Sequence, residues 1–226
     1  MKIALISDIH GNYPALEAVL EKIDRDIDIF CAGDVVGYNP FPNKVVRKLK
    51  EREVSCVLGN HDNALLSNDT SWFNPVAAEA INWTLSNLGE KEKEYIKELP
   101  NFRKVDLDGF KIYVTHGSPH SIREYVMPST PHLKLKGMID EVGADLLVLG
   151  HTHIPMDKEF ENGRIVNPGS VGQPRDGDHR ASFATFDTKE NELSMHRVEY
   201  DIDMVNSKIK EVGLPENLGE RLYLGR

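Results

Sequence analysis

Short apolar segments alternate with amphipathic ones along the first 150 residues. The apolar segments are rich in β-branched residues, as buried strands are, and they span residues 2–7, 27–30, 54–58, 111–115 and 145–149. Between them, apolar residues recur at helical spacing, which predicts helices from Asn12 to about residue 23 and over 42–52, 75–87, 90–98 and 132–142. This alternation indicates an α/β fold with the helices outside the sheet.

The pattern changes after residue 155, where apolar and polar residues alternate over short distances. Segments 158–167, 181–187 and 192–200 predict antiparallel or mixed strands and, with them, a second sheet. The final segment carries apolar residues at helical spacing followed by Gly213 and Pro215, which predicts one or two closing helices at about 201–226. Since no linker, repeat or low-complexity stretch divides the sequence, we expect a single domain over residues 1–226.

Composition narrows the class of protein. With 226 residues, of which 40% are hydrophobic and 28% charged, the chain can bury a sizeable core. A formal net charge of -9 disfavours binding to bulk nucleic acid, because such binding needs a basic surface. No apolar stretch approaches the length of a membrane span, and the cysteines, Cys31 and Cys56, lie in apolar runs outside any CxxC spacing. We therefore expect a cytoplasmic protein with free thiols and no membrane association.

Each of the five predicted strands ends beside a side chain that can bind a metal ion. In chain order, these side chains are Asp8 and His10, Asp34, Asn60 and His61, His116, and His151 and His153. Ligands of open α/β sheets bind beyond the carboxyl ends of the strands, so five such ends can converge on one site. The sequence therefore predicts a metal site at the carboxyl edge of the sheet.

Local spacing supports this prediction. Residues i and i+2 of an extended segment point the same way, about 7 Å apart, so Asp8 and His10 can reach one ion while His151 and His153 serve two neighbouring ions. Asp34 is the natural bridge, because one carboxylate offers an oxygen to each cation. Taken singly, these motifs are turn or surface residues more often than ligands. Their order at five strand ends carries the prediction.

The ordered motifs DIH (8–10), GD (33–34), GNHD (59–62), HG (116–117) and GHTH (150–153) closely resemble those of the calcineurin-like metallophosphoesterase superfamily. Within it, the chain looks like the small prokaryotic phosphodiesterases and their protein-phosphatase-like relatives, and the similarity extends through residues 167–178 and 213–222. The resemblance implies an α/β fold in the form of a four-layer αββα sandwich, in which two mixed sheets are flanked by helices.

The resemblance also implies a pair of divalent metal ions. The first would be held by Asp8, His10, Asp34 and His153, and the second by Asp34, Asn60, His116 and His151. Imidazole, carboxylate and amide ligands together suit Mn, Fe, Ni, Co or Zn better than calcium. We expect manganese.

Two cations that share a water lower its pKa, and the resulting bridging hydroxide can attack phosphorus in line. His61, which we do not expect to bind metal, would stabilise the transferring phosphoryl group or protonate the leaving oxygen. Asp62 would orient His61 and favour its cationic form; its alternative role is a helix cap. His61 and Asp62 are therefore the predicted catalytic pair.

Candidates for substrate binding are Asn12, Arg175, His120 and Arg123, with His179 beside them. Each has a structural alternative: Asn12 can cap the first helix, and Arg175 can be an exposed loop residue. His132 and His196 are expected to be structural. We interpret Trp72, Phe73 and Trp83 as packing residues rather than a base-stacking platform, because no basic residues interleave with them.

These residues predict a metal-dependent phosphoesterase that acts on phosphodiesters. The alternatives are a phosphomonoesterase or protein phosphatase and, from another class, a non-catalytic metal-binding scaffold. A complete set of ligands together with His61 argues against the scaffold. The expected partners are a small phosphoester substrate or a phosphoprotein, and a second copy of the chain in a homo-oligomer.

Overall fold

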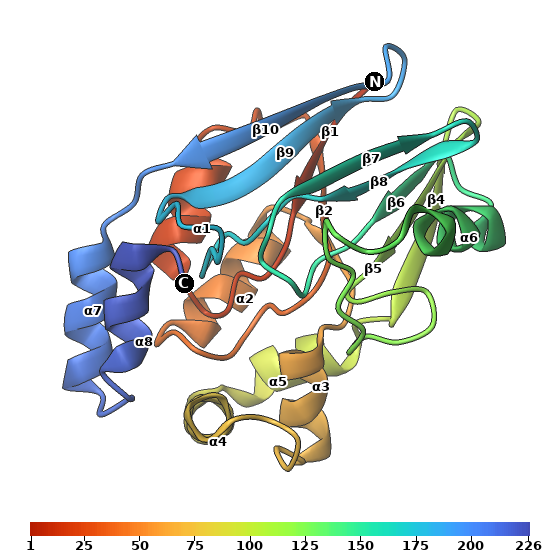
Figure 1. Ribbon diagram of the computed structural model, residues 1–226. Coiled ribbons are helices and arrows are strands. Elements are labelled where there is room, and N and C mark those ends of the chain that lie inside the picture. The colour runs from red at the N-terminus through yellow and green to blue at the C-terminus, as the bar shows by residue number, and fades with distance from the viewer.

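Two mixed five-stranded sheets form the centre of the protein (Figure 1). The computed structural model describes all 226 residues. The first sheet has the order β10-β9-β1-β2-β3 and contains β1 (Lys2–Ile6), β2 (Asp28–Cys31), β3 (Ser55–Cys56), β9 (Ala181–Asp187) and β10 (Glu192–Val198). The second has the order β4-β5-β6-β8-β7 and contains β4 (Phe102–Leu107), β5 (Phe110–Thr115), β6 (Leu146–Val148), β7 (Met156–Phe160) and β8 (Gly163–Asn167).

Helices cover the outer faces of both sheets and one end of the molecule (Figure 1). They are α1 (Tyr13–Leu20), α2 (Pro42–Glu51), α3 (Asn60–Ser67), α4 (Pro75–Asn87), α5 (Glu90–Lys97), α6 (His132–Val142), α7 (Ile202–Glu211), α8 (Asn217–Glu220) and the short 3-10 helix η1 (Arg221–Leu224). None of these helices combines the length and the apolar character that crossing a membrane requires.

Alternate side chains of the central strands explain the layered packing. In β1, Ile3 and Leu5 point into a cluster between the sheets, whereas Ala4 and Ile6 pack against α1 and α2. A strand buried on both faces must be apolar at consecutive positions, which is why KIALI reads as a continuous run. The same division occurs around β6, whose outer face packs against α6. The predicted αββα sandwich is confirmed.

The assignment of strands to sheets was partly wrong. The C-terminal strands β9 and β10 do not build the second sheet; they extend the first, where β9 pairs antiparallel with β1. The second sheet instead takes β5 and β6, which resemble the strands of the first sheet in sequence. Periodicity reports how strands are buried but not which strands pair, so it could not distinguish the two arrangements.

We did not predict β4 or α3 from the sequence, and we treated the two strands β7 and β8 as one segment. Strand β4 is half exposed along its length and forms a hairpin with β5 across Asp108 and Gly109, a turn that favours glycine. Helix α3, which we did not predict, begins at Asn60, inside the GNHD motif. The segment expected as one strand over 158–167 is the hairpin of β7 and β8.

The C-terminal helices pack beside α4 rather than against either sheet. A small apolar cluster joins them to α4 and to Tyr38, and it includes Val205, Leu218 and Leu222, each at most 1% exposed. The end of the chain is thereby fixed close to the loop that follows β2.

Candidate active site

Loops from the ends of five strands converge on one buried cluster. Strands β1, β2 and β3 of the first sheet and β5 and β6 of the second lead into it, so the cluster lies where the two sheets meet, at the edge that the resemblance implied. All seven expected metal ligands are at most 4% exposed: Asp8, His10, Asp34, Asn60, His116, His151 and His153. The structure thus brings every one of them together.

Five of these residues have a left-handed backbone. The φ angles are 53° at Asp8, 50° at His10, 52° at Asp34, 68° at His151 and 60° at His153. Such conformations cost free energy for residues other than glycine, and they persist where the surrounding structure imposes them. For Asp8, His10 and Asp34, hydrogen bonds between the first two loops hold this conformation, because Asp8 N donates to Gly33 O at 3.0 Å and His10 N donates to Asp34 O at 2.9 Å. The backbone strain therefore coincides with the proposed ligands.

The first group of candidate ligands contains Asp8, His10 and His153, whose ligand atoms lie within 4.8 Å of one another. The Nε2 atoms of the two histidines are 3.1 Å apart, and His153 Nε2 is 3.3 Å from Asp8 Oδ1. The carboxylate of Asp8 is held by the backbone N–H of His151, which donates to both of its oxygens.

The second group contains Asp34, His116 and His151. Oδ2 of Asp34 lies 3.4 Å from His116 Nε2 and 3.5 Å from His10 Nε2, so this single oxygen is within reach of both groups. Asn60 joins the second group, because its Oδ1 is 2.8 Å from His116 Nε2.

Backbone carbonyls orient the four imidazole rings. In three of them Nδ1 donates to a carbonyl oxygen and Nε2 turns inward: His10 to Val36 at 3.2 Å, His116 to Ala32 at 2.7 Å and His153 to Gln173 at 2.6 Å. In His151 it is Nε2 that donates, to the carbonyl of Arg123 at 3.2 Å, which leaves Nδ1 as its ligand atom. Hydrogen bonds of this kind fix the tautomer of metal-binding histidines.

The electrostatics differ among the histidines: against the effect of burial, the charge of Asp34 raises the pKa of His116 to about 9, whereas the other three rings are shifted the opposite way. Burial lowers the pKa values of His10, His151 and His153, so these rings are neutral and can donate a lone pair to a metal. Burial also raises the pKa of Asp8 to about 7, because a buried carboxylate lacks solvation. A divalent cation would stabilise the ionised form of this carboxylate. The mixed nitrogen and oxygen donors fit such an ion.

His61 lies against the cluster. Its backbone N–H donates to Asp34 Oδ1 at 2.8 Å, and its Nδ1 is buried without a hydrogen-bond partner. Its ring also falls within a group with His10 and Asp34, although we had expected no metal-binding position there. Burial lowers the pKa of His61 to about 4, despite the opposing effect of Asp34, so the ring is neutral.

Asp62 does not contact the His61 ring, and our prediction that it orients this ring was wrong. Its carboxylate accepts hydrogen bonds from the backbone N–H groups of Val35 at 3.2 Å, Val36 at 3.1 Å and Gly59 at 3.0 Å. Asp62 therefore closes the first turn of α3 and ties it to the loop that carries Asp34. The structure supports the alternative capping role and shows no contact that would favour a cationic His61.

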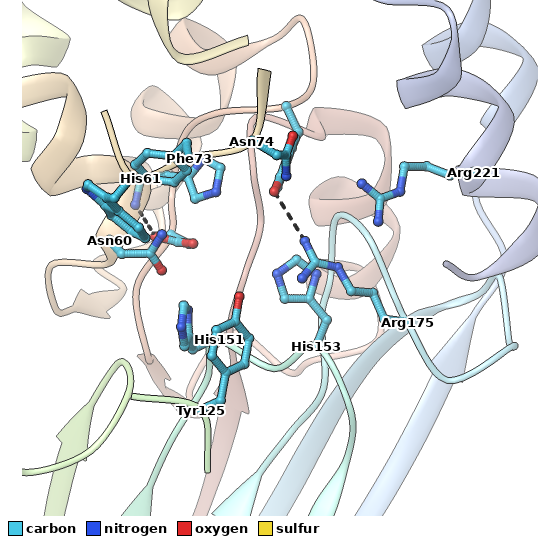
Figure 2. Close-up of a pocket in the computed structure, with 12 residues that line it drawn as sticks. Asn60, His61, Phe73, Asn74, Tyr125, His151, His153, Arg175 and Arg221 are labelled. Atoms are coloured by element: carbon cyan, nitrogen blue, oxygen red, sulfur yellow. Dashed lines mark hydrogen bonds between the residues drawn. The ribbon is translucent and has the colours of Figure 1, made fainter. Parts of the chain in front are cut away.

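A cavity of about 270 Å³ opens beside the cluster (Figure 2). Its lining includes the expected residues Asp34, Asn60, His61, His151, His153 and Arg175, and also Tyr38, Trp72, Phe73, Asn74, Tyr125 and Arg221. The second set was missed because its members come from segments without a metal-binding motif. Trp72 packs as expected, against the ring of Phe73 at 3.8 Å and the guanidinium of Arg123 at 4.1 Å, but it is 36% exposed and also lines the cavity.

Of the four candidates for substrate binding, the structure places only Arg175 in the cavity. Asn12 is fully buried; it caps α1 by accepting from Ala15 N, and it donates to Gly172 O at 2.9 Å. His120 is on the surface, 3.3 Å from a carboxylate oxygen of Glu141. Asn12 therefore has the capping role that was its structural alternative. His120 has a surface contact and no place in the cavity.

Arg123 and His179 also lie outside the cavity lining. Arg123 reaches it only indirectly, through Trp72 and through the carbonyl that accepts from His151. His179 is on the surface, where its Nε2 is 3.1 Å from Glu199. Sequence position alone could not separate these residues from Arg175, which also lies in a loop.

Comparison with known proteins defines the class. A model of the calcineurin-like phosphoesterase superfamily domain matches residues 1–191, so the chain belongs to this superfamily. It is 39% identical to an uncharacterized protein of Methanocaldococcus jannaschii over 99% of this chain and 98% of that protein. It is 27% identical to phosphodiesterase YfcE of Escherichia coli, over 83% of this chain and 88% of the relative. A crystal structure of a metallophosphoesterase from Sphaerobacter thermophilus superposes with a TM-score of 0.86 at 36% identity and covers 100% of this chain and 99% of its own.

Membership of this superfamily confirms the resemblance that the motifs indicated. Proteins of the family use divalent metals, and the two groups of buried histidines and aspartates are the candidate ligands in this chain. The site therefore has the composition of a metal-dependent phosphoesterase centre.

Proposed function

We propose that this protein is a phosphodiesterase that uses two divalent cations. The observation that carries the proposal is the position of Asp34, whose Oδ2 is nearly equidistant from His10 in the first ligand group and His116 in the second. A carboxylate shared in this way suits a pair of ions, which in two-metal hydrolases lie about 3.5–4 Å apart.

The first cation is assigned to Asp8, His10, Asp34 and His153, and the second to Asp34, Asn60, His116 and His151. Manganese is the first choice of metal, with iron, nickel, cobalt and zinc as alternatives. These residues would hold the two cations, which when bound would lower the pKa of a water and offset charge on the phosphoryl oxygens.

His61 acts on the phosphoryl group from the cavity side. Because Nδ1 is buried without an acceptor, placing the proton there would leave an unsatisfied N–H, so the neutral ring carries its proton on Nε2. Nε2 is then a hydrogen-bond donor to a phosphoryl oxygen or to the leaving oxygen. Asp62 contributes as a positioning residue, since it fixes the backbone on which both His61 and Asp34 are held.

The preference for diesters rests on the relatives that are named phosphodiesterases. Hydrolysis of bis-p-nitrophenyl phosphate and of p-nitrophenyl phosphate, measured side by side with added Mn²⁺, tests it. We expect a higher kcat/KM for the diester. A clear preference for the monoester would replace the proposal with the phosphomonoesterase alternative, and no turnover of either in metal-loaded protein would favour a scaffold.

A further inference from the structure

Two arginines share the far side of the cavity without an acidic side chain as partner. Arg175 and Arg221 both line it, and neither forms an ion pair with an acidic side chain; their hydrogen bonds go to the side chains of Tyr38 and Gln173 and to the main-chain oxygen of Arg226. The chain carries 36 acidic residues against 27 lysines and arginines, so an arginine pair without an acidic side-chain partner is unexpected. Unpaired cations near one another repel, and an anion between them would remove this cost.

Both guanidinium groups retain free donors. Arg175 uses Nη2 for Tyr38 Oη at 3.3 Å and Gln173 Oε1 at 3.1 Å, while its Nε is buried without an acceptor. Arg221 uses only Nε, which donates to the carbonyl of Arg226 at 2.6 Å. The remaining terminal nitrogens have the planar, forked arrangement that matches a phosphate or a carboxylate.

Tyr38 stands between the two arginines but does not account for them. The guanidinium carbons lie 5.8 Å and 5.9 Å from the centroid of its ring, close to the limit of about 6 Å for a cation–π contact. Contacts this long are weak. Burial and then the charge of Arg175 lower the pKa of Arg221, so the two guanidinium groups lie close enough to affect one another.

The pair is held at a fixed spacing by the backbone. Gly177 N, two residues after Arg175, donates to Gly225 O at 3.0 Å, four residues after Arg221. Leu222, next to Arg221, is 1% exposed within the C-terminal cluster. Arg221 also lies beyond residue 191, where the match to the family ends, so this contribution to the cavity is a feature of the C-terminal segment.

The position of the pair relative to the metal cluster points to its ligand. Arg175 adjoins the cluster, because its backbone N donates to the carbonyl of His153 at 3.3 Å, and Figure 2 shows Arg221 on the side of Arg175 away from His151. An anion between the arginines would therefore lie next to the phosphoryl group under attack, and not in its place.

We propose that Arg175 and Arg221 form a subsite for a second anionic group of the substrate, a phosphate or carboxylate that is not hydrolysed. This inference rests on the proposed function, since it assumes that the scissile phosphoryl group lies at the metal cluster. It assigns the substrate to phosphoesters that carry a further negative charge beside the cleaved bond.

The test compares two non-hydrolysable ligands on metal-loaded protein: methylphosphonate, with one anionic group, and methylenediphosphonate, with two. Binding is measured by titration calorimetry at fixed free Mn²⁺, and independently by inhibition of bis-p-nitrophenyl phosphate hydrolysis. In Arg221→Gln we expect the affinity for the diphosphonate to fall about tenfold, since a charge-assisted forked contact is lost, and that for the monophosphonate to change less than about twofold. Arg221→Lys should lie between the two, because it keeps the charge and loses the fork.

Arg25→Gln is the matched control, because Arg25 is exposed and its side chain makes no hydrogen bond or ion pair; its affinities should equal those of the wild type. Equal losses for both ligands in Arg221→Gln would show that the arginine binds the scissile group, and no loss would show that it binds neither; each result overturns the subsite. If Arg221→Gln does not fold, as judged by its thermal melt, Arg221→Lys and Arg175→Lys take its place. In each, the loss of affinity for the diphosphonate is compared with the loss for the monophosphonate. Because calorimetry needs no turnover, failure of the subsite is distinguishable from failure of the proposed function, which the hydrolysis of the diester by wild-type protein reports.

Discussion

His61 is the residue whose proposed role depends most on a single atom. Its Nδ1 is sealed in the protein and only Nε2 can serve the substrate. In His61→Ala we expect kcat for the diester to fall by about 10²–10⁴, the usual effect of losing a proton donor. Metal content, measured by inductively coupled plasma mass spectrometry, should stay that of the wild type. Loss of metal together with activity would instead make His61 a ligand, as its place beside His10 and Asp34 permits.

Gly37 explains why the His61 ring can occupy its position. A Cβ at residue 37 would lie 2.6 Å from His61 Nδ1, closer than van der Waals contact allows, so Gly37→Ala should displace the ring. We expect kcat to fall by about 10², as small displacements of a catalytic group do. Gly109→Ala is a matched control, because Gly109 has a similar φ, +92° against +96°, and no neighbour within 4 Å of the added atom. Both variants bear the backbone strain of about 1–3 kcal/mol, and only the first should lose activity.

At the scale of elements, the loop that carries Arg175 is held by ion pairs, one within the loop to Arg180 and one to Arg197 of β10. Asp178 accepts from Arg180 Nη2 at 2.7 Å, and Arg197 Nε lies 3.8 Å away. These contacts, first the hydrogen bonds from Arg180, hold the pKa of Asp178 well below its usual range. A carboxylate whose pKa is lowered by folding stabilises the protein above its unfolded pKa and loses that contribution as the pH falls.

Asp178→Asn should therefore lower the free energy of unfolding by about 0.5–1 kcal/mol at neutral pH, the range for a largely solvated ion pair. The difference from wild type should shrink as the pH falls below about 4, the unfolded pKa of an aspartate. Urea unfolding of chelator-treated protein at several pH values measures it, with Asp26→Asn as a control on an exposed residue that makes no side-chain contact. A difference that is constant with pH would mean that the ionised carboxylate does not stabilise the loop.

For the molecule as a whole, the proposed ligands link the two sheets. The loops of the first sheet contribute Asp8, His10, Asp34 and Asn60, and those of the second contribute His116, His151 and His153. Bound cations should therefore stabilise the folded state, by about 2.7 kcal/mol at a metal concentration one hundred times Kd. Removal of metal with EDTA should lower Tm by about 5–10 °C for a chain of this size, as measured by calorimetry. An unchanged Tm would indicate that the cluster binds no metal under those conditions.

The sequence predicted the layered fold and the buried cluster because both depend on local patterns. A strand such as β1, buried on both faces, is apolar from Ile3 to Ile6, and ligands at strand ends follow directly from the run before them. The order of strands could not be predicted in this way, since β9 pairs with β1 across a separation in sequence of nearly the whole chain. Long-range pairing leaves no periodic signal.

The cavity shows the same limit at the level of side chains. Arg175 and His120 lie in polar loops that look alike in sequence, yet one lines the cavity and the other pairs with Glu141. Arg221 lies in the segment 213–222 that resembles the family, but nothing in that segment indicated a place in the cavity, because its position beside Tyr38 depends on how the C-terminal helices pack against α4. A motif names the ligands of a metal, whereas the residues around a substrate are set by tertiary packing.

The most direct test of the central claim is the number of metal ions per chain. Protein loaded with Mn²⁺ and freed of excess metal can be analysed by inductively coupled plasma mass spectrometry, with Asp34→Asn beside it. We predict two ions per chain in the wild type, and one or fewer in the variant, because a neutral amide in place of the shared carboxylate cannot offset the repulsion of two cations. A single ion in a fully active wild type, or two ions in Asp34→Asn, would contradict the account.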